Sequence, residues 1–137
     1  MTAGAAVAVA FPDGRAEVGV GPAFGYERAL SRVVSIEVGG ALAVAPRSRT
    51  VGGSAGLSVP FYLIGDAPSG FFLAPGLAMA IGRYEVGFGG GLSIGYQHVF
   101  GSGLALGVSA GSTLTYRDLS YYGTFGVSLG AAAGYAF

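Results

Sequence analysis

Few side chains of this chain could do chemistry. It has one histidine, His98, no cysteine and no lysine, and its seven acidic residues are balanced by seven arginines. A zinc site of the usual kind needs several His or Cys ligands, and a Ser-His-acid triad would have to assemble around that single ring. The sequence therefore predicts a protein that is not an enzyme and that holds no metal or cofactor.

Glycine-rich stretches could in principle cradle phosphate. The run at residues 87–91 is the densest, but no lysine follows it and no helix pattern succeeds it, as a phosphate-binding loop would require. The net charge of zero also argues against a nucleic-acid partner. These glycines are better interpreted as small residues and bends within strands.

The remaining candidates are polar side chains expected on one face of the strands. Glu27 and Glu37 are predicted on neighbouring strands near one end, with Glu37 the deeper, whereas Arg83 and Arg117 belong near the other end. One interpretation is an ion-pair network that orders the interior, and the other is a polar constriction in a narrow water path. The candidate set is Glu17, Glu27, Glu37, Arg83, Glu85, Gln97 and Arg117.

The elements that position these residues are strands with two unlike faces. In the last segment the odd positions from Tyr121 to Phe137 are mostly bulky and apolar, whereas the even positions are small or weakly polar. Successive side chains of a strand point to opposite faces, so this period of two predicts a strand. The same split recurs along the chain and predicts eight strands, at residues 2–11, 16–27, 33–46, 51–64, 70–82, 84–99, 103–116 and 121–137.

The distribution of charge decides which face turns outward. Only 10% of residues are charged, against roughly 25% in ordinary soluble domains, and 52% are hydrophobic. The small face carries too little charge for a water-facing exterior, so we expect the bulky face in lipid and the small face in the lumen. An open sheet edge is very costly in lipid, which predicts one all-β domain over residues 1–137, a closed antiparallel up-and-down transmembrane barrel.

Turn residues and aromatic residues fit this arrangement. Gly, Pro, Asp and Ser clusters separate the predicted strands at residues 12–15, 28–32, 46–50, 65–69, 82–83, 101–102 and 117–120. Aromatic residues gather near the ends of the bulky faces, as membrane-interface girdles do. The predicted girdle residues are Phe11, Phe24, Tyr26, Phe61, Phe71, Tyr84, Tyr96, Phe100, Tyr116, Tyr121, Tyr135 and Phe137.

The pattern over the whole chain resembles the small bacterial outer-membrane barrels of the OmpA/OmpX type, and the terminal Tyr135-Ala136-Phe137 is its most specific element. Ala132 stands where that family's assembly signal usually has glycine. The resemblance implies an outer-membrane location, membrane lipid as partner with lipopolysaccharide at the outer rim, recognition by the barrel-assembly machinery, and a monomer. Residues 1–11 lack the basic start of a signal peptide, so we expect a mature chain, or one to which Met1 was added. The short loops also suit a trimmed or designed barrel.

Two functions follow as hypotheses. The first is a non-enzymatic structural protein or scaffold embedded in the membrane. The alternative is a narrow, porin-like pore or a small-ligand-holding barrel, because the inward residues at mid-height are mostly Gly, Ala and Ser and would not fill a barrel of ordinary shear. A Gly/Ala-rich β-fibre is a third hypothesis, disfavoured by the regular strand and turn units.

Overall fold

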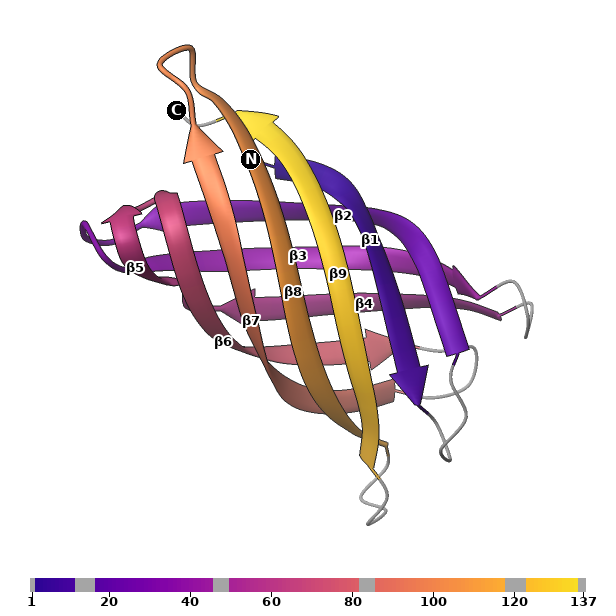
Figure 1. Ribbon diagram of the computed structural model, residues 1–137. Coiled ribbons are helices and arrows are strands. Elements are labelled where there is room, and N and C mark those ends of the chain that lie inside the picture. The colour runs from indigo at the N-terminus through magenta and orange to yellow at the C-terminus, as the bar shows by residue number, and fades with distance from the viewer. Residues whose placement is uncertain (1, 12–16, 46–49, 82–85, 118–122, 136–137) are drawn as a thin grey trace.

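The protein is described from a computed structural model that covers residues 2–11, 17–45, 50–81, 86–117 and 123–135. The described residues are almost entirely β-strand, and the strands follow one another along the chain as antiparallel neighbours (Figure 1). Their bounds are β1 (Thr2–Phe11), β2 (Glu17–Ala29), β3 (Ser35–Ala45), β4 (Thr50–Ser58), β5 (Phe61–Asp66), β6 (Ser69–Ile81), β7 (Val86–Val99), β8 (Leu104–Arg117) and β9 (Gly123–Tyr135).

The strands β4 and β5 are two halves of one barrel strand. β4 pairs with β6 from Gly53 to Ser58, and β5 pairs with β6 from Phe61 onward. Between them the Val59 N–H donates to the Pro75 carbonyl at 2.9 Å, so the ladder continues across the interruption. Pro60 has no N–H to donate to a ladder, which explains why the strand is interrupted there. The nine labelled strands therefore make eight barrel strands, and the predicted strand at 51–64 is one of them, with a break.

The sheet curls into a nearly closed barrel. The order is β4-β3-β2-β1-β9-β8-β7-β6-β5, and the β4–β6 pairing joins the two ends of the sheet. In Figure 1 the strands β7, β8, β9 and β1 run steeply across one side, while β2, β3 and β4 cross behind them. The weak seam lies along β5, which reaches the segment before β3 through the isolated bridge Val34–Phe61 and a few backbone hydrogen bonds. The all-β, antiparallel up-and-down barrel predicted from the sequence is confirmed.

The barrel carries its bulky apolar side chains on the outside. Leu77, Phe88 and Leu129 are each more than 60% exposed, and exposure alternates along β9 residue by residue. Among the described residues the buried hydrophobic side chains are Tyr62, Ala74 and Ala105. The usual arrangement of a soluble domain is thus inverted, because most large apolar groups face away from the interior.

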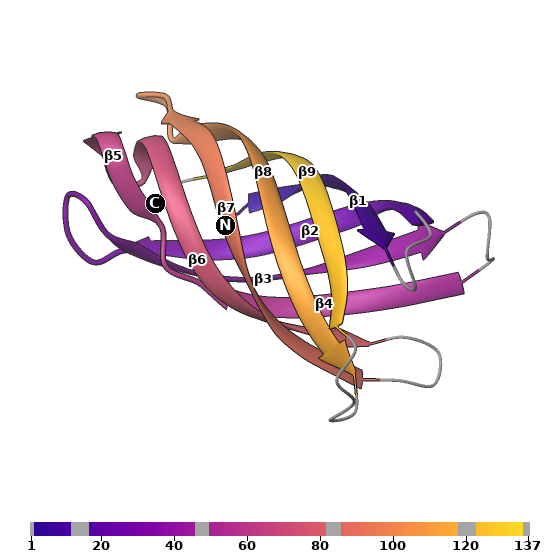
Figure 2. The same ribbon diagram turned by 60° about the horizontal axis from the view of Figure 1, so that its bottom comes forward.

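One end of the barrel, the polar end, has inward-facing polar side chains. It carries the turns at residues 30–34, 67–68 and 100–103. The chain ends meet there as well, since Thr2 pairs with Gly134 on β9 and Tyr135 pairs with Leu104. The N and C labels lie close together in both ribbon views (Figures 1 and 2). Glu27, Tyr62 and Gln97 lie just inside this end.

Candidate lumen site

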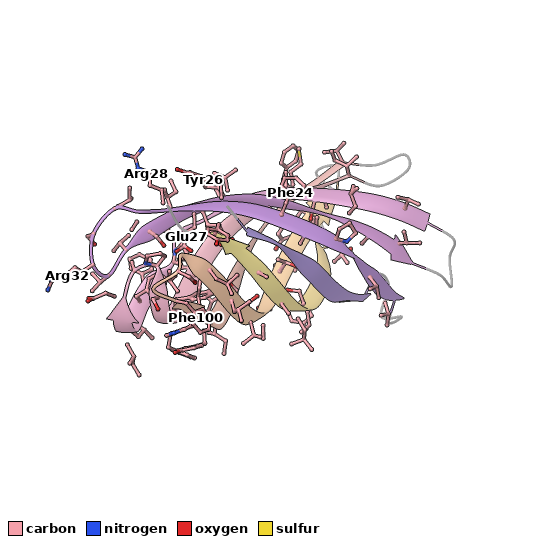
Figure 3. All side chains as sticks on the ribbon, turned by 90° about the horizontal axis from the view of Figure 1, so that it is seen from above. Phe24, Tyr26, Glu27, Arg28, Arg32 and Phe100 are labelled. Carbon is pink, nitrogen blue, oxygen red and sulfur yellow. The ribbon has the colours of Figure 1, made fainter. Side chains whose placement is uncertain are left out.

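The pairing of β2 with β3 places two carboxylates opposite each other. Glu27 and Glu37 are Cα partners in that ladder, and both belong to the inward face. Figure 3 shows Glu27 directed into the barrel, whereas Tyr26 and Arg28 on either side of it point away from the barrel. Alternation along β2 explains this, because neighbours in a strand face opposite sides of the sheet.

Glu27 is the hub of a hydrogen-bond network that spans the barrel. Its Oε1 accepts hydrogen bonds from the hydroxyl of Tyr62 at 2.7 Å and from the hydroxyl of Ser35. Its Oε2 accepts from Nε2 of Gln97 at 3.0 Å, and that same Nε2 donates to the Pro68 carbonyl at 2.8 Å. Ser35 is fully buried. The network therefore ties β2, β5 and β7 together across the interior at the polar end.

Glu37 has a different environment from Glu27. Its Oε2 accepts one hydrogen bond, from the hydroxyl of Ser58 at 3.0 Å. Within the described part of the chain no hydrogen-bond partner is found for its other carboxylate oxygen. A carboxylate in the interior needs hydrogen-bond partners or water to offset its desolvation. This second oxygen of Glu37 is therefore the acceptor in the site that a bound molecule could contact.

Two aromatic rings, which the sequence analysis did not single out, complete the polar end. Tyr62 on β5 is 4% exposed and pairs with Phe72 on β6, with ring centroids 5.7 Å apart. The Phe72 ring lies over Gly95 on β7, where an added Cβ would come within 2.5 Å of the ring. The signal was present in the sequence, because Tyr62 and Phe72 fall on the inward parity of their strands.

Two open cavities formed by described residues extend into the barrel interior. The smaller, about 190 Å³, is at the polar end and is lined by Glu27, Glu37, Tyr62, Phe72 and Gln97 among others. The larger, about 290 Å³, is at mid-height and is lined mostly by Gly, Ala, Ser and Thr. One water needs only about 10–15 Å³ on this measure. The small inward residues thus leave space for several waters or one small molecule.

The remaining polar candidates lie outside the part of the polar end that the structure describes. They are Glu17, Arg83, Glu85 and Arg117. Glu17 begins β2 and Arg117 ends β8, but the description does not extend to their side chains. Arg83 and Glu85 lie outside the described residues. The hypothesis of an ion-pair network at that end therefore stays a prediction. At the polar end the described partners of Glu27 are hydroxyl groups and an amide.

Most predicted girdle residues lie on the outer surface. The predicted girdle residues whose side chains are exposed are Phe24, Tyr26, Phe61, Phe71, Tyr96, Phe100, Tyr116 and Tyr135. The side chain of Phe11 is outside the description, as are Tyr84, Tyr121 and Phe137. Their role at a membrane interface remains a prediction.

One charged residue of β2 lies on the outer, mostly apolar face of the barrel. β2 continues to Ala29, beyond the predicted strand end at residue 27, so Arg28 lies within the strand on its outer face. It is exposed and close to the turn that carries Arg32 (Figure 3). Arg28 is the second-last residue of β2, and its long side chain can reach water from there, which explains its position on the outer face.

The single histidine is on the outer face. His98 is exposed, and its ring meets Phe100 edge-on at a centroid distance of 4.6 Å. Across the residues that the structure covers, no group of three or more His, Cys, Asp or Glu side chains could hold a metal ion. The described residues include no helix long and apolar enough to cross a membrane.

Comparisons with known proteins give no match: no protein-family model, no curated protein and no solved structure resembles this chain significantly.

Proposed function

We propose that this protein is an integral membrane barrel that serves as a structural protein or scaffold, without enzymatic activity. The observation that carries the proposal is the inverted distribution of side chains, with Leu77 70% exposed while the inward face holds small residues and a polar network. Such a surface would be costly in water over its whole extent and is favourable in hydrocarbon.

The dimensions of the strands support membrane insertion. Strands such as β6 and β7 have 13 and 14 residues. A tilted strand needs about 9–11 residues to cross the hydrocarbon core, which leaves a few for the interfaces. The exposed aromatic residues suit those interfaces.

The resemblance to OmpA/OmpX-type barrels extends the proposal to location and partners. We place the protein in a bacterial outer membrane as a monomer, in contact with lipid and, at its outer rim, with lipopolysaccharide. The barrel-assembly machinery is the proposed partner during insertion. A nucleic-acid partner is not part of the proposal, because the net charge is zero.

The chain contains no tryptophan, which allows a direct test of which face meets lipid. Leu129→Trp places a single tryptophan on the outer face, and Ser54→Trp places one on the inner face beside the larger cavity. After reconstitution in vesicles, lipids brominated on their acyl chains should quench the first tryptophan and leave the second nearly unchanged. Equal quenching of both, or quenching of neither, would refute the proposed insertion.

A second candidate is a narrow pore, favoured by the hollow at mid-height. Single-channel recording on protein shown by protease protection to be inserted separates the two functions. We expect no current steps, because Tyr62, Phe72, Gln97 and Glu27 crowd the polar end. Reproducible steps would favour the pore over the closed scaffold.

A further inference from the structure

The two facing carboxylates at the polar end are not equivalent. Glu27 has both oxygens engaged by donors from three other side chains. Glu37 has one oxygen engaged, by Ser58, and lines both interior cavities. Among the described residues, therefore, Glu37 is the inward carboxylate that has one oxygen without a hydrogen-bond partner, and this oxygen could contact a molecule in the lumen.

The two cavities meet around Glu37. Ser93 also lines both, so a molecule in the lumen could extend from the polar end toward mid-height past these two residues. Each cavity far exceeds the roughly 10–15 Å³ that one water requires, and both are smaller than the roughly 300–1,000 Å³ of drug-sized pockets. A small metabolite-sized ligand fits this space, whereas a peptide does not.

The walls of the smaller cavity favour a positively charged organic group. Tyr62 and Phe72 line it beside the two carboxylates, and Phe72 is the more accessible of the two aromatic residues. Aromatic faces attract cations, and rings combined with a carboxylate are a recurrent way to recognise ammonium groups. The two arginines whose side chains are described, Arg28 and Arg32, are exposed and line neither cavity. Neither of them can therefore act as the internal counterion of Glu37.

We propose that the lumen binds a small organic ammonium ion, with Glu37 as its anionic contact and Phe72 and Tyr62 as its aromatic walls. The uncharged part of the ligand would extend along the Gly, Ala and Ser lining of the larger cavity. This inference goes beyond the proposed scaffold function. It requires the folded barrel but not its insertion, so the two proposals can fail separately.

The test compares two probes of the same shape, choline and its uncharged isostere 3,3-dimethylbutan-1-ol. Binding to the folded barrel is measured by isothermal titration calorimetry in a maltoside detergent, because phosphocholine detergents carry the probe group. The buffer contains Na⁺, so choline must compete with an inorganic cation for the site. Binding under these conditions shows that the site prefers the organic cation. We expect choline to bind at least about tenfold more tightly than the alcohol. Equal affinities, or no binding of choline, would overturn the proposal.

Two substitutions locate the site. Glu37→Gln keeps the shape but removes the charge, and Phe72→Leu keeps an apolar group but removes the ring; each should weaken choline binding about tenfold or more. Asp66→Asn is the matched control, since it removes one negative charge from the exposed β5–β6 hairpin at the same end. Its affinity for choline should stay within about twofold of the original, because exposed charges are screened.

Heat-modifiable migration on a gel checks that each variant folds. If Glu37→Gln folds and binds choline as the original does, or if Asp66→Asn weakens binding as much as Glu37→Gln, the assignment to Glu37 is wrong. If a substituted barrel fails to fold, the preference of the unaltered protein for choline over its isostere still decides whether the lumen selects a cation.

Discussion

At the scale of single residues, the interior is organised by hydrogen bonds to one carboxylate. Glu27 accepts from Ser35, Tyr62 and Gln97, which come from positions 8, 35 and 70 residues away. Removing one donor leaves a buried acceptor less satisfied, which costs more than a surface hydrogen bond. Tyr62 is the most revealing member, because its ring also packs on Phe72.

Tyr62→Phe tests this network with the smallest change of shape. It removes the hydroxyl that donates to Glu27 and keeps the ring, so we expect a loss of about 1–3 kcal/mol in the free energy of unfolding. Urea unfolding of the barrel in lipid vesicles measures it. Tyr96→Phe is the control, since Tyr96 is exposed on the outer face and should change stability by less than about 0.5 kcal/mol. Equal effects of the two substitutions would show that the network does not stabilise the barrel.

At the scale of elements, the β5–β6 hairpin requires glycine at specific positions. Gly65 and Gly70 have φ values of 95° and 145°, which side-chain-bearing residues rarely adopt. They are Cα partners at the base of the turn, and an added Cβ on Gly70 would lie 2.0 Å from the Ile64 carbonyl oxygen. The hairpin holds Tyr62 and Phe72 in place, so its geometry also shapes the lumen.

Gly70→Ala should therefore destabilise the barrel by at least about 1–3 kcal/mol through backbone strain and displacement of Ile64. The same urea titration measures the loss. Gly101→Ala is the matched control in another turn at the polar end, because nothing lies within 4 Å of its added Cβ. If Gly70→Ala and Gly101→Ala lower the free energy of unfolding equally, this account is wrong.

At the scale of the whole molecule, the side chains on the outer surface determine whether the barrel is more stable in lipid or in water. Leu77 lies well within β6, away from its ends, and is 70% exposed, whereas Val33 is 53% exposed in the turn before β3. If the surface lies in lipid, the cost of a charge must depend on its depth. A soluble barrel would tolerate both charges equally.

Leu77→Arg should thus cost about 2–4 kcal/mol of unfolding free energy in vesicles, and Val33→Arg about 0–1 kcal/mol. Unfolding of each variant in vesicles provides the values. Repeating the titration in detergent micelles adds a control. A micelle deforms around a charge more easily than a bilayer does, so the two arginine variants should differ less in unfolding free energy there. Equal costs in vesicles would argue that the Leu77 surface does not lie in the hydrocarbon.

The sequence by itself determined the sheet and its two faces. Alternation is local, since adjacent side chains of any strand point to opposite sides, so the outward positions of residues such as Leu77 and Tyr96 follow from parity alone. Parity also assigned Glu27, Glu37 and Gln97 to the interior. The number of strands followed from the turn residues between them, with the break at Pro60 as the one irregularity.

Only the tertiary structure decided which inward residues meet. Parity assigns a face but not a height, and height depends on the register and tilt of strands that are distant in the chain. Tyr62 and Gln97 reach Glu27 because β5, β7 and β2 are staggered so that these residues share one level of the barrel. That same stagger leaves Glu37 between two cavities. A one-residue slip of register would exchange inside and outside, which is why the sheet as a whole, rather than any single strand, determines the site.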